Sequence, residues 1–301
     1  MYRILITGSN GLLGQKLVHL LRNKKDVELL ATSSGVNRIS AQEGYRYQSL
    51  DVTSKPQVDE LLDKWRPTTI IHTAALTLVD LCETEIERCH ALNVSSVEYL
   101  LAAAERIKAH LLHISTDFVF NGESGPYKED DIPDPLSEYA RSKYRAEQIL
   151  IHSKYKHWSI ARTIILYGHT ENMSRSNVVL WARDTLKKGG PMKIVDDQFR
   201  APTLAEDLAL GCWAITENHA YGIYHLSGPE TISVIEMVRR IARFYGLSEE
   251  NISATDTASL GQAAARPPHT GFILDKARKD LGYAPRSLEE GLALLDEQLP
   301  L

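Results

Sequence analysis

Residues 3–14 read RILITGSNGLLG, a short apolar run followed by three glycines at a spacing of three. The helical pattern that continues through Leu21 predicts a buried strand, a glycine turn and a helix N-terminus in that order. Here the glycines allow a tight turn, leave room for a diphosphate against the backbone, and let the helix pack closely on the strand. The stretch therefore predicts a dinucleotide-binding loop made of Gly8, Asn10, Gly11, Leu12, Leu13 and Gly14.

The next strand predicts which dinucleotide is bound. Residues 27–32 end without the acidic residue that would hold a ribose 2′-hydroxyl, and Ser33 and Arg38 follow instead. An arginine can accept a 2′-phosphate, so we expect NADP, with NAD as the alternative. A solvated loop charge is the competing interpretation of Arg38.

Two further stretches are expected to line the cofactor. Asp51 and Val52 follow a β-like run, and the aspartate can cap the next turn or hydrogen-bond an adenine amine. Residues 69–75 form an apolar strand that ends in Ala74 and Ala75, whose small side chains would let the backbone approach a ligand.

The chemistry is expected where the strand at residues 111–120 carries Ser115, Thr116 and Asp117. In open parallel sheets ligands bind outside the carboxyl ends of the strands. A β-branched core residue is the alternative role for Thr116.

Tyr139 and Lys143 lie four residues apart in a segment, residues 138–151, that reads as helix. That spacing places the phenol and the ammonium on one face, about one turn apart. A nearby cation should lower the pKa of the phenol, so that the pair can exchange a proton with a carbonyl oxygen. Alone, the pair also fits a solvated helix face.

Strands and helices alternate through residue 167, which predicts a doubly wound α/β (Rossmann) domain over residues 1–167. The pattern includes a long helix from Ile86 to Arg106 with Asn93 in its interior and a strand from Trp158 to Leu166, and a later helix is predicted from Pro202 to Glu217. Beyond it the rhythm changes to a smaller α+β domain. We expect residues 202–228 to return to the first sheet, and residues 168–201 and 229–301 to form the substrate domain.

The composition is that of an ordinary globular protein, with 43% hydrophobic and 24% charged residues and a formal net charge of −5. No basic footprint for nucleic acid, apolar run of membrane-spanning length or signal peptide is apparent, so a cytoplasmic protein is expected. Cys82, Cys89 and Cys212 lie in helical segments, and no second ligand pair at finger spacing accompanies Cys89-His90. Neither a disulfide framework nor a metal site is expected.

Taken together, the motifs resemble the extended short-chain dehydrogenase/reductase family over essentially the whole chain. The elements that carry the resemblance are Gly8-x-x-Gly11-x-x-Gly14, Asp51-Val52, Ala74-Ala75, Asn93-Val94, Ser115-Thr116, Tyr139-x-x-x-Lys143 and Arg162-x-x-x-x-Tyr167-Gly168. Within that family the chain looks like the dTDP-4-dehydrorhamnose reductase branch. The branch-specific stretches are 74–80, 115–122, 197–203, 266–267 and 274–283.

The resemblance implies an NAD(P)H-dependent reductase of a 4-keto-6-deoxy nucleotide sugar. Tyr139 would protonate the carbonyl oxygen as hydride reaches the carbon. Lys143 would hold the nicotinamide ribose, and Thr116 would hydrogen-bond the carbonyl.

The residues expected against the sugar are Thr77, Asp117, Phe118 and Ile165. The branch usually carries a tyrosine at the position of Phe118 and a tryptophan at that of Ile165, which leaves the sugar open. Arg200 and Arg266 are expected to bind a substrate diphosphate, because a guanidinium fork suits phosphate oxygens.

The same fold also serves two other functions. A cofactor-binding regulatory subunit similar to the methionine adenosyltransferase β subunit remains open, because such proteins can keep the tyrosine and lysine. An epimerase or dehydratase is disfavoured, because Asp117 is not followed by a glutamate. A homodimer is kept open as the assembly.

Overall fold

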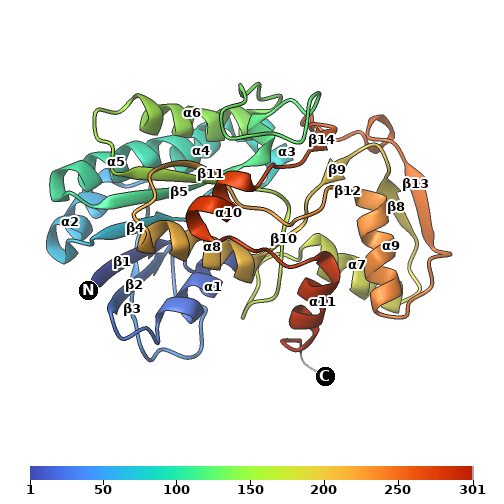
Figure 1. Ribbon diagram of the computed structural model, residues 1–301, viewed down its shortest axis with the longest axis horizontal. Helices are drawn as coiled ribbons and strands as arrows, with labels where there is room; N and C mark the ends of the chain where they lie inside the picture. Colours follow the sequence, from blue (N-terminus) through green and yellow to red (C-terminus); the bar gives the residue numbers. More distant parts are fainter. Residues whose placement is uncertain (300–301) are drawn as a thin grey trace.

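The computed structural model describes residues 1–299. Its centre is a seven-stranded, fully parallel sheet in the order β11-β6-β5-β4-β1-β2-β3 (Figure 1). The strands are β1 (Tyr2–Thr7), β2 (Val27–Ser33), β3 (Arg46–Ser49), β4 (Thr69–His72), β5 (His110–Thr116), β6 (Trp158–Thr163) and β11 (Gly222–His225). The predicted doubly wound α/β fold is confirmed.

Helices cover both faces of this sheet. One apolar cluster joins α1 (Leu12–Leu21) and α8 (Ala205–Glu217) to side chains such as Ile6 and Ile71. The other joins α2 (Lys55–Trp65), α5 (Ser96–Ile107) and α6 (Glu138–His152) to Leu5, Ile70 and Leu111. Both faces of each central strand are thus buried, which explains their continuous apolar runs.

The helix predicted from Ile86 to Arg106 is not a continuous α-helix. After α3 (Val79–Thr84), the chain forms α4 (Ile86–His90), a π-helical stretch η1 (Ala91–Ser95) and then α5. Buried Asn93 lies in the π-helical stretch, and π-bulges are frequent at functional sites.

The strand predicted over residues 158–166 is also interrupted. β6 ends at Thr163, Ile165 adopts a φ of 20°, and the two-residue β7 (Leu166–Tyr167) pairs with β10 (Thr203–Leu204) instead of the main sheet. The helix expected from Pro202 accordingly begins later, at Ala205.

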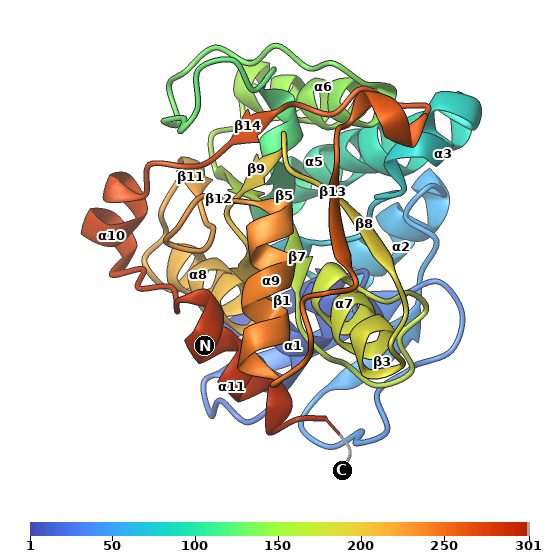
Figure 2. The same cartoon turned by 90° about the vertical axis from the view of Figure 1, so that its right-hand side faces the viewer.

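A separate apolar core lies at the side of the molecule shown in Figure 2, between α9, α7 and α11. Its elements and their neighbours are α7 (Val178–Lys187), β8 (Met192–Val195), β9 (Phe199–Arg200), β12 (Ile232–Ser233), α9 (Val234–Phe244), β13 (Ile252–Thr255), η3 (Ala258–Leu260), β14 (His269–Thr270) and α11 (Leu288–Asp296). Helix α10 (Asp275–Leu281) instead packs beside α8 and β11, and its Ala277 belongs to the cluster of α1 and α8. The boundaries predicted for a substrate domain stay a prediction.

Within residues 1–299, no helix combines the length and the apolarity needed to cross a membrane.

Candidate active site

The glycine loop is a cradle that leaves no space for side chains. A Cβ on Gly8, where φ is 68°, would lie 2.7 Å from the nitrogen of Ala74, and one on Gly14 would lie 2.3 Å from the carbonyl oxygen of Gly8. The Gly11 N-cap provides no side-chain cap for α1. The helix N-terminus therefore keeps backbone donors for an anion, and a dinucleotide diphosphate fits this loop.

Asn10 ties the loop to the segment after β2. Its side chain accepts a hydrogen bond from the backbone nitrogen of Arg38 (2.9 Å) and donates to the carbonyl of Val36 (2.8 Å). The hydroxyl of Tyr47 donates to the carbonyls of Ser33 (3.3 Å) and Gly35 (2.8 Å). Arg38 is thereby held beside the predicted diphosphate site.

The other predicted cofactor residues follow β3 and β4. Asp51 performs the capping role, because its Oδ1 accepts from the Thr53 nitrogen (2.9 Å) and hydroxyl (2.6 Å). Val52 follows it as a buried residue. Ala74, with Ala75 after it, follows β4, at the closest approach to Gly8.

Helix α6 brings Tyr139 and Lys143 together on a buried face. It begins after Ser137, whose hydroxyl caps the nitrogen of Ala140 (3.3 Å). The exposed fractions of the tyrosine and lysine are 9% and 2%. A solvated helix face is excluded.

Lys143 is anchored to β5 behind the predicted catalytic residues. Its Nζ donates to the carbonyl of Ile114 (2.7 Å) and to Nε2 of His113 (3.0 Å). Burial lowers the pKa of Lys143 to about 8, and the charge of Glu147 opposes that shift.

The prediction that Lys143 lowers the pKa of Tyr139 is wrong for this structure. Burial raises the pKa of the phenol above its ordinary value, the neighbouring Thr116 side chain opposes the shift, and the charge of Asp117 adds to it. Desolvation dominates, and the Lys143 ammonium is directed at His113 and Ile114. Tyr139 is therefore a protonated phenol at neutral pH.

Thr116 and Asp117 lie where β5 passes into a short 3₁₀ turn, η2 (Asp117–Val119). The Thr116 hydroxyl donates to Asp117 Oδ1 (3.0 Å) and accepts from the Phe118 nitrogen (3.2 Å). The Thr270 hydroxyl donates to the other carboxylate oxygen of Asp117. Burial raises the pKa of Asp117, while the charge of Arg200 lowers it.

Phe118 connects this group to Tyr139 and Arg200. Its ring meets the Tyr139 ring edge-on at 6.1 Å between centroids, and the Arg200 guanidinium lies 5.5 Å from its centre. Arg200 is buried and donates to the carbonyls of Phe199, Pro268 and Pro267 at 2.7, 3.2 and 2.7 Å. These contacts build the wall of the site, and phosphate binding by Arg200 stays a prediction.

Arg266 forms a bidentate ion pair with Asp80 (2.6 and 3.1 Å). The Asp80 carboxylate also accepts a hydrogen bond from the Ala264 nitrogen (3.0 Å). The hydrogen bond from Arg266 lowers the pKa of Asp80. Of the remaining predicted contacts, Thr77 accepts from Arg175 (3.0 Å) and Ile165 lies half-buried in the bend between β6 and β7.

Three residues at the site were not among the sequence-predicted site residues. Asn93 pairs with both backbone groups of Leu76 (2.8 and 3.0 Å) and donates to Ser142 on α6 (2.9 Å). Its signals were its place inside a helical pattern and the Asn93-Val94 pair of the family resemblance. Thr270 and Arg175 arrive from distant segments, and nothing local in the sequence marks them.

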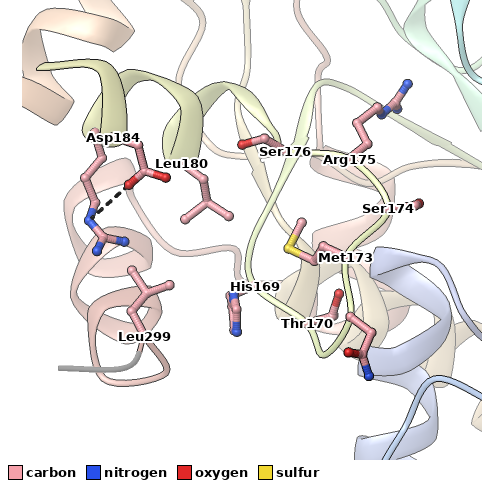
Figure 3. A pocket seen from close by; sticks show the side chains of 11 residues that line it. His169, Thr170, Met173, Ser174, Arg175, Ser176, Leu180, Asp184 and Leu299 are labelled. Atoms are coloured by element: carbon pink, nitrogen blue, oxygen red, sulfur yellow. Dashed lines mark ion pairs between the residues drawn. The ribbon is translucent and has the colours of Figure 1, made fainter. Parts of the chain in front are cut away.

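An open cavity of about 500 Å³ lies between the loop before α7, residues of α7 itself and Leu299 (Figure 3). His169, Met173, Leu180 and Leu299 point into it, whereas the Arg175 side chain extends away from His169. It lies apart from Tyr139, which is not among its lining residues.

Cys82 and Cys89 are buried next to Tyr139, with their sulfur atoms 2.7 Å apart. Among the described residues no group of three or more histidine, cysteine, aspartate or glutamate side chains could hold a metal ion.

Comparisons with known proteins give a consistent picture. The model of the RmlD substrate binding domain matches residues 2–299. A dTDP-4-dehydrorhamnose reductase of Aggregatibacter actinomycetemcomitans is 32% identical, over 97% of each chain. A methionine adenosyltransferase 2 subunit beta of Xenopus tropicalis is 30% identical over 95% of this chain and 84% of its own length.

Among solved structures, a dTDP-4-dehydrorhamnose reductase of Bacillus anthracis in complex with NADP has a TM-score of 0.83 at 29% identity. The match covers 99% of this chain and all of the other.

Proposed function

Because the chain belongs to the RmlD substrate binding domain family, we propose that it is an NADPH-dependent reductase of a 4-keto-6-deoxy nucleotide sugar. Similarity to dTDP-4-dehydrorhamnose reductases over nearly the whole chain supports this activity, and the solved relative that carries NADP supports the cofactor.

The observation that carries the proposal is the convergence of Thr116, Tyr139 and Lys143 at the carboxyl end of β5. The Phe118 ring, two residues after Thr116, meets the Tyr139 ring edge-on (6.1 Å between centroids), and Lys143 donates to the carbonyl of Ile114, two residues before Thr116 (2.7 Å). They stand beside a glycine cradle at the end of β1, two strands away in the sheet. A hydroxyl, a phenol and a buried ammonium next to a dinucleotide site are suited to carbonyl reduction.

The nicotinamide, when bound, supplies the hydride. The residues that would hold the dinucleotide are the Gly8–Gly14 loop, Arg38 and Lys143. Tyr139 holds its proton at neutral pH, because burial raises its pKa. It is thus a general acid that donates to the carbonyl oxygen as negative charge develops there.

Thr116 and Asp117 would orient the sugar. The carboxylate accepts from the Thr116 hydroxyl (3.0 Å) and so fixes its orientation at the end of β5. Phe118 and Ile165 present apolar surface where a phenol hydroxyl and an indole are usual in the resembled reductases, so the sugar-facing wall has fewer polar groups here. Arg175, which donates to Thr77, would provide positive charge for a diphosphate, and Arg266 would bind one by exchanging its contacts with Asp80.

A spectrophotometric assay tests the proposal. Purified protein is mixed with NADPH and a panel of 4-keto nucleotide sugars that includes dTDP-4-dehydrorhamnose, and nicotinamide absorbance is followed. We expect turnover with at least one member. Tyr139→Phe should lower kcat by about 10²- to 10⁴-fold with NADPH affinity retained, as is typical for loss of a general acid.

The matched control is Tyr144→Phe. Tyr144 is a neighbouring tyrosine of α6 that packs against the apolar cluster of α1 and α8. The variant should keep full activity. Equal rates for Tyr139→Phe and wild type would contradict the assigned role of the phenol.

A regulatory subunit is the second candidate, favoured by the relative of 30% identity named methionine adenosyltransferase 2 subunit beta. NADPH binding without turnover across the panel, with recovery of a stoichiometric enzyme partner, would support it against the reductase. The predicted homodimer stays a prediction, and the same preparation tests it by light scattering.

A further inference from the structure

A row of polar side chains crosses three strands of the sheet beneath the proposed active site. Thr7, His72 and His113 are register neighbours on the adjacent strands β1, β4 and β5. All three are buried, with exposed fractions of 0–1%. Two residues earlier in each strand the same face carries Leu5, Ile70 and Leu111. Burying two imidazoles in this core costs free energy unless hydrogen bonds compensate for the lost contact with water.

The two imidazoles stack, with ring centroids 5.4 Å apart and an angle of 27° between the planes. Burial lowers the pKa of His72 to about 3 and that of His113 well below its ordinary value. Both rings are therefore neutral at physiological pH. A neutral imidazole has one donor and one acceptor nitrogen, and its hydrogen bonds decide which is which.

The partners of His72 fix its tautomer. The Ser96 hydroxyl donates to the carbonyl of Leu92 (2.6 Å), so its oxygen accepts from His72 Nε2 at 3.2 Å. The Nδ1 of His72 then accepts from the Thr7 hydroxyl (2.7 Å). His72 carries its proton on Nε2.

His113 is fixed the opposite way. Its Nε2 lies 3.0 Å from Nζ of Lys143, and a lysine ammonium can only donate. Nε2 must therefore accept, and the proton lies on Nδ1, which has no hydrogen-bond partner among the described residues. The acceptor role at Nε2 is thus kept although the other ring nitrogen is left unpaired.

From this arrangement we propose that His113 is a positioning residue for Lys143 in the proposed reductase site. His113 Nε2 and the Ile114 carbonyl hold two of the three ammonium hydrogens from the β5 side. The third is left for the cofactor or substrate. A neutral acceptor fixes the ammonium without placing a second charge beside it. This role rests on the proposed reductase activity, because His113 would orient the lysine that holds the cofactor there.

Charged and titratable groups around Lys143 set the direction of the expected pH effect. Burial lowers the pKa of Lys143, while the charges of Glu147 on α6 and Cys89 on α4 raise it. The lysine also faces His113 on β5 and His72 on β4. Removing the His113 acceptor disfavours the charged ammonium. The loss of Lys143 charge should then occur at lower pH, and NADPH affinity should decline at lower pH with it.

Nitrogen-15 NMR of the cofactor-free protein with labelled histidines tests the tautomers directly, and His113→Gln assigns the resonances. We expect His113 with an unprotonated Nε2 and His72 with a protonated Nε2. A protonated Nε2 on His113 would overturn the proposal. This readout needs no enzymatic activity, so failure of the reductase assay leaves it decisive.

Binding of NADPH as a function of pH tests the positioning role. His113→Leu should weaken NADPH binding roughly tenfold, the scale of a hydrogen bond to a charged group, and shift its alkaline decline to lower pH. His113→Gln, whose side-chain oxygen can take the place of Nε2, should restore both. Equal behaviour of the two variants would overturn the proposal, whereas His110→Gln on the same strand should leave binding unchanged.

Discussion

The burial of Lys143 should make the stability of the protein depend on pH in a way that one substitution removes. Lys143 has an exposed fraction of 2%, and its pKa falls from 10.5 to about 8 in the folded chain. Lys143→Met replaces the ammonium with an apolar group of similar length. Comparing the two proteins at each pH isolates the lysine, because every other titrating group contributes nearly equally to both.

The sign follows from proton binding. Between about pH 8 and pH 10.5 the unfolded chain keeps the proton on this lysine and the folded chain releases it. The free energy of unfolding of the wild type therefore rises with pH across this window. Each pKa unit corresponds to about 1.4 kcal/mol. Between about pH 7 and pH 10, the free energy of unfolding of the wild type should therefore rise by roughly 2 to 3 kcal/mol relative to that of Lys143→Met.

Urea denaturation of both proteins across this range measures the difference. Lys193→Met, at an exposed lysine of β8, is the control, and its difference from the wild type should stay constant. A wild-type to Lys143→Met difference that is flat within error would refute the account of a buried ammonium. At pH 7 the variant should lose NADPH binding without losing its fold.

Two further substitutions test the scaffold. Arg162→Met leaves Glu147 buried without its bidentate partner (2.9 and 2.6 Å), so the free energy of unfolding in urea should fall by about 3–5 kcal/mol. A loss below about 1 kcal/mol would contradict the assignment of a buried pair. Gly14→Ala places a Cβ 2.3 Å from the Gly8 carbonyl oxygen. NADPH binding by fluorescence titration should weaken by more than about tenfold, given a cost of a few kcal/mol for overpacking, and unchanged affinity would refute the cradle.

Much of the fold was predictable because its signals are local. The glycine loop at residues 8–14 and the Tyr139-Lys143 spacing each occupy one short stretch, and parallel strands bring their carboxyl ends to one edge. The interruptions at Asn93 and Ile165 were not predictable, because neither residue type breaks an element by itself.

The electrostatics of the site depend on what is buried, which spacing does not reveal. Tyr139 and Lys143 do share a helix face, yet the ammonium turns to His113 and the phenol is desolvated. The stacking of His113 on His72 requires two strands, 41 residues apart at these positions, to lie in register. The hydrogen bond between Asp117 and Thr270 joins residues 153 positions apart. No periodicity encodes such pairs.

The 153 residues between Asp117 and Thr270 also mean that the site is completed late in synthesis. Six of the seven strands of the central sheet, the glycine cradle and Tyr139 are translated before residue 170, and α8 and β11 complete the sheet by residue 225. The hydroxyl that holds the Asp117 carboxylate follows only at residue 270. A chain released between these points would carry the complete central sheet without an assembled place for the sugar.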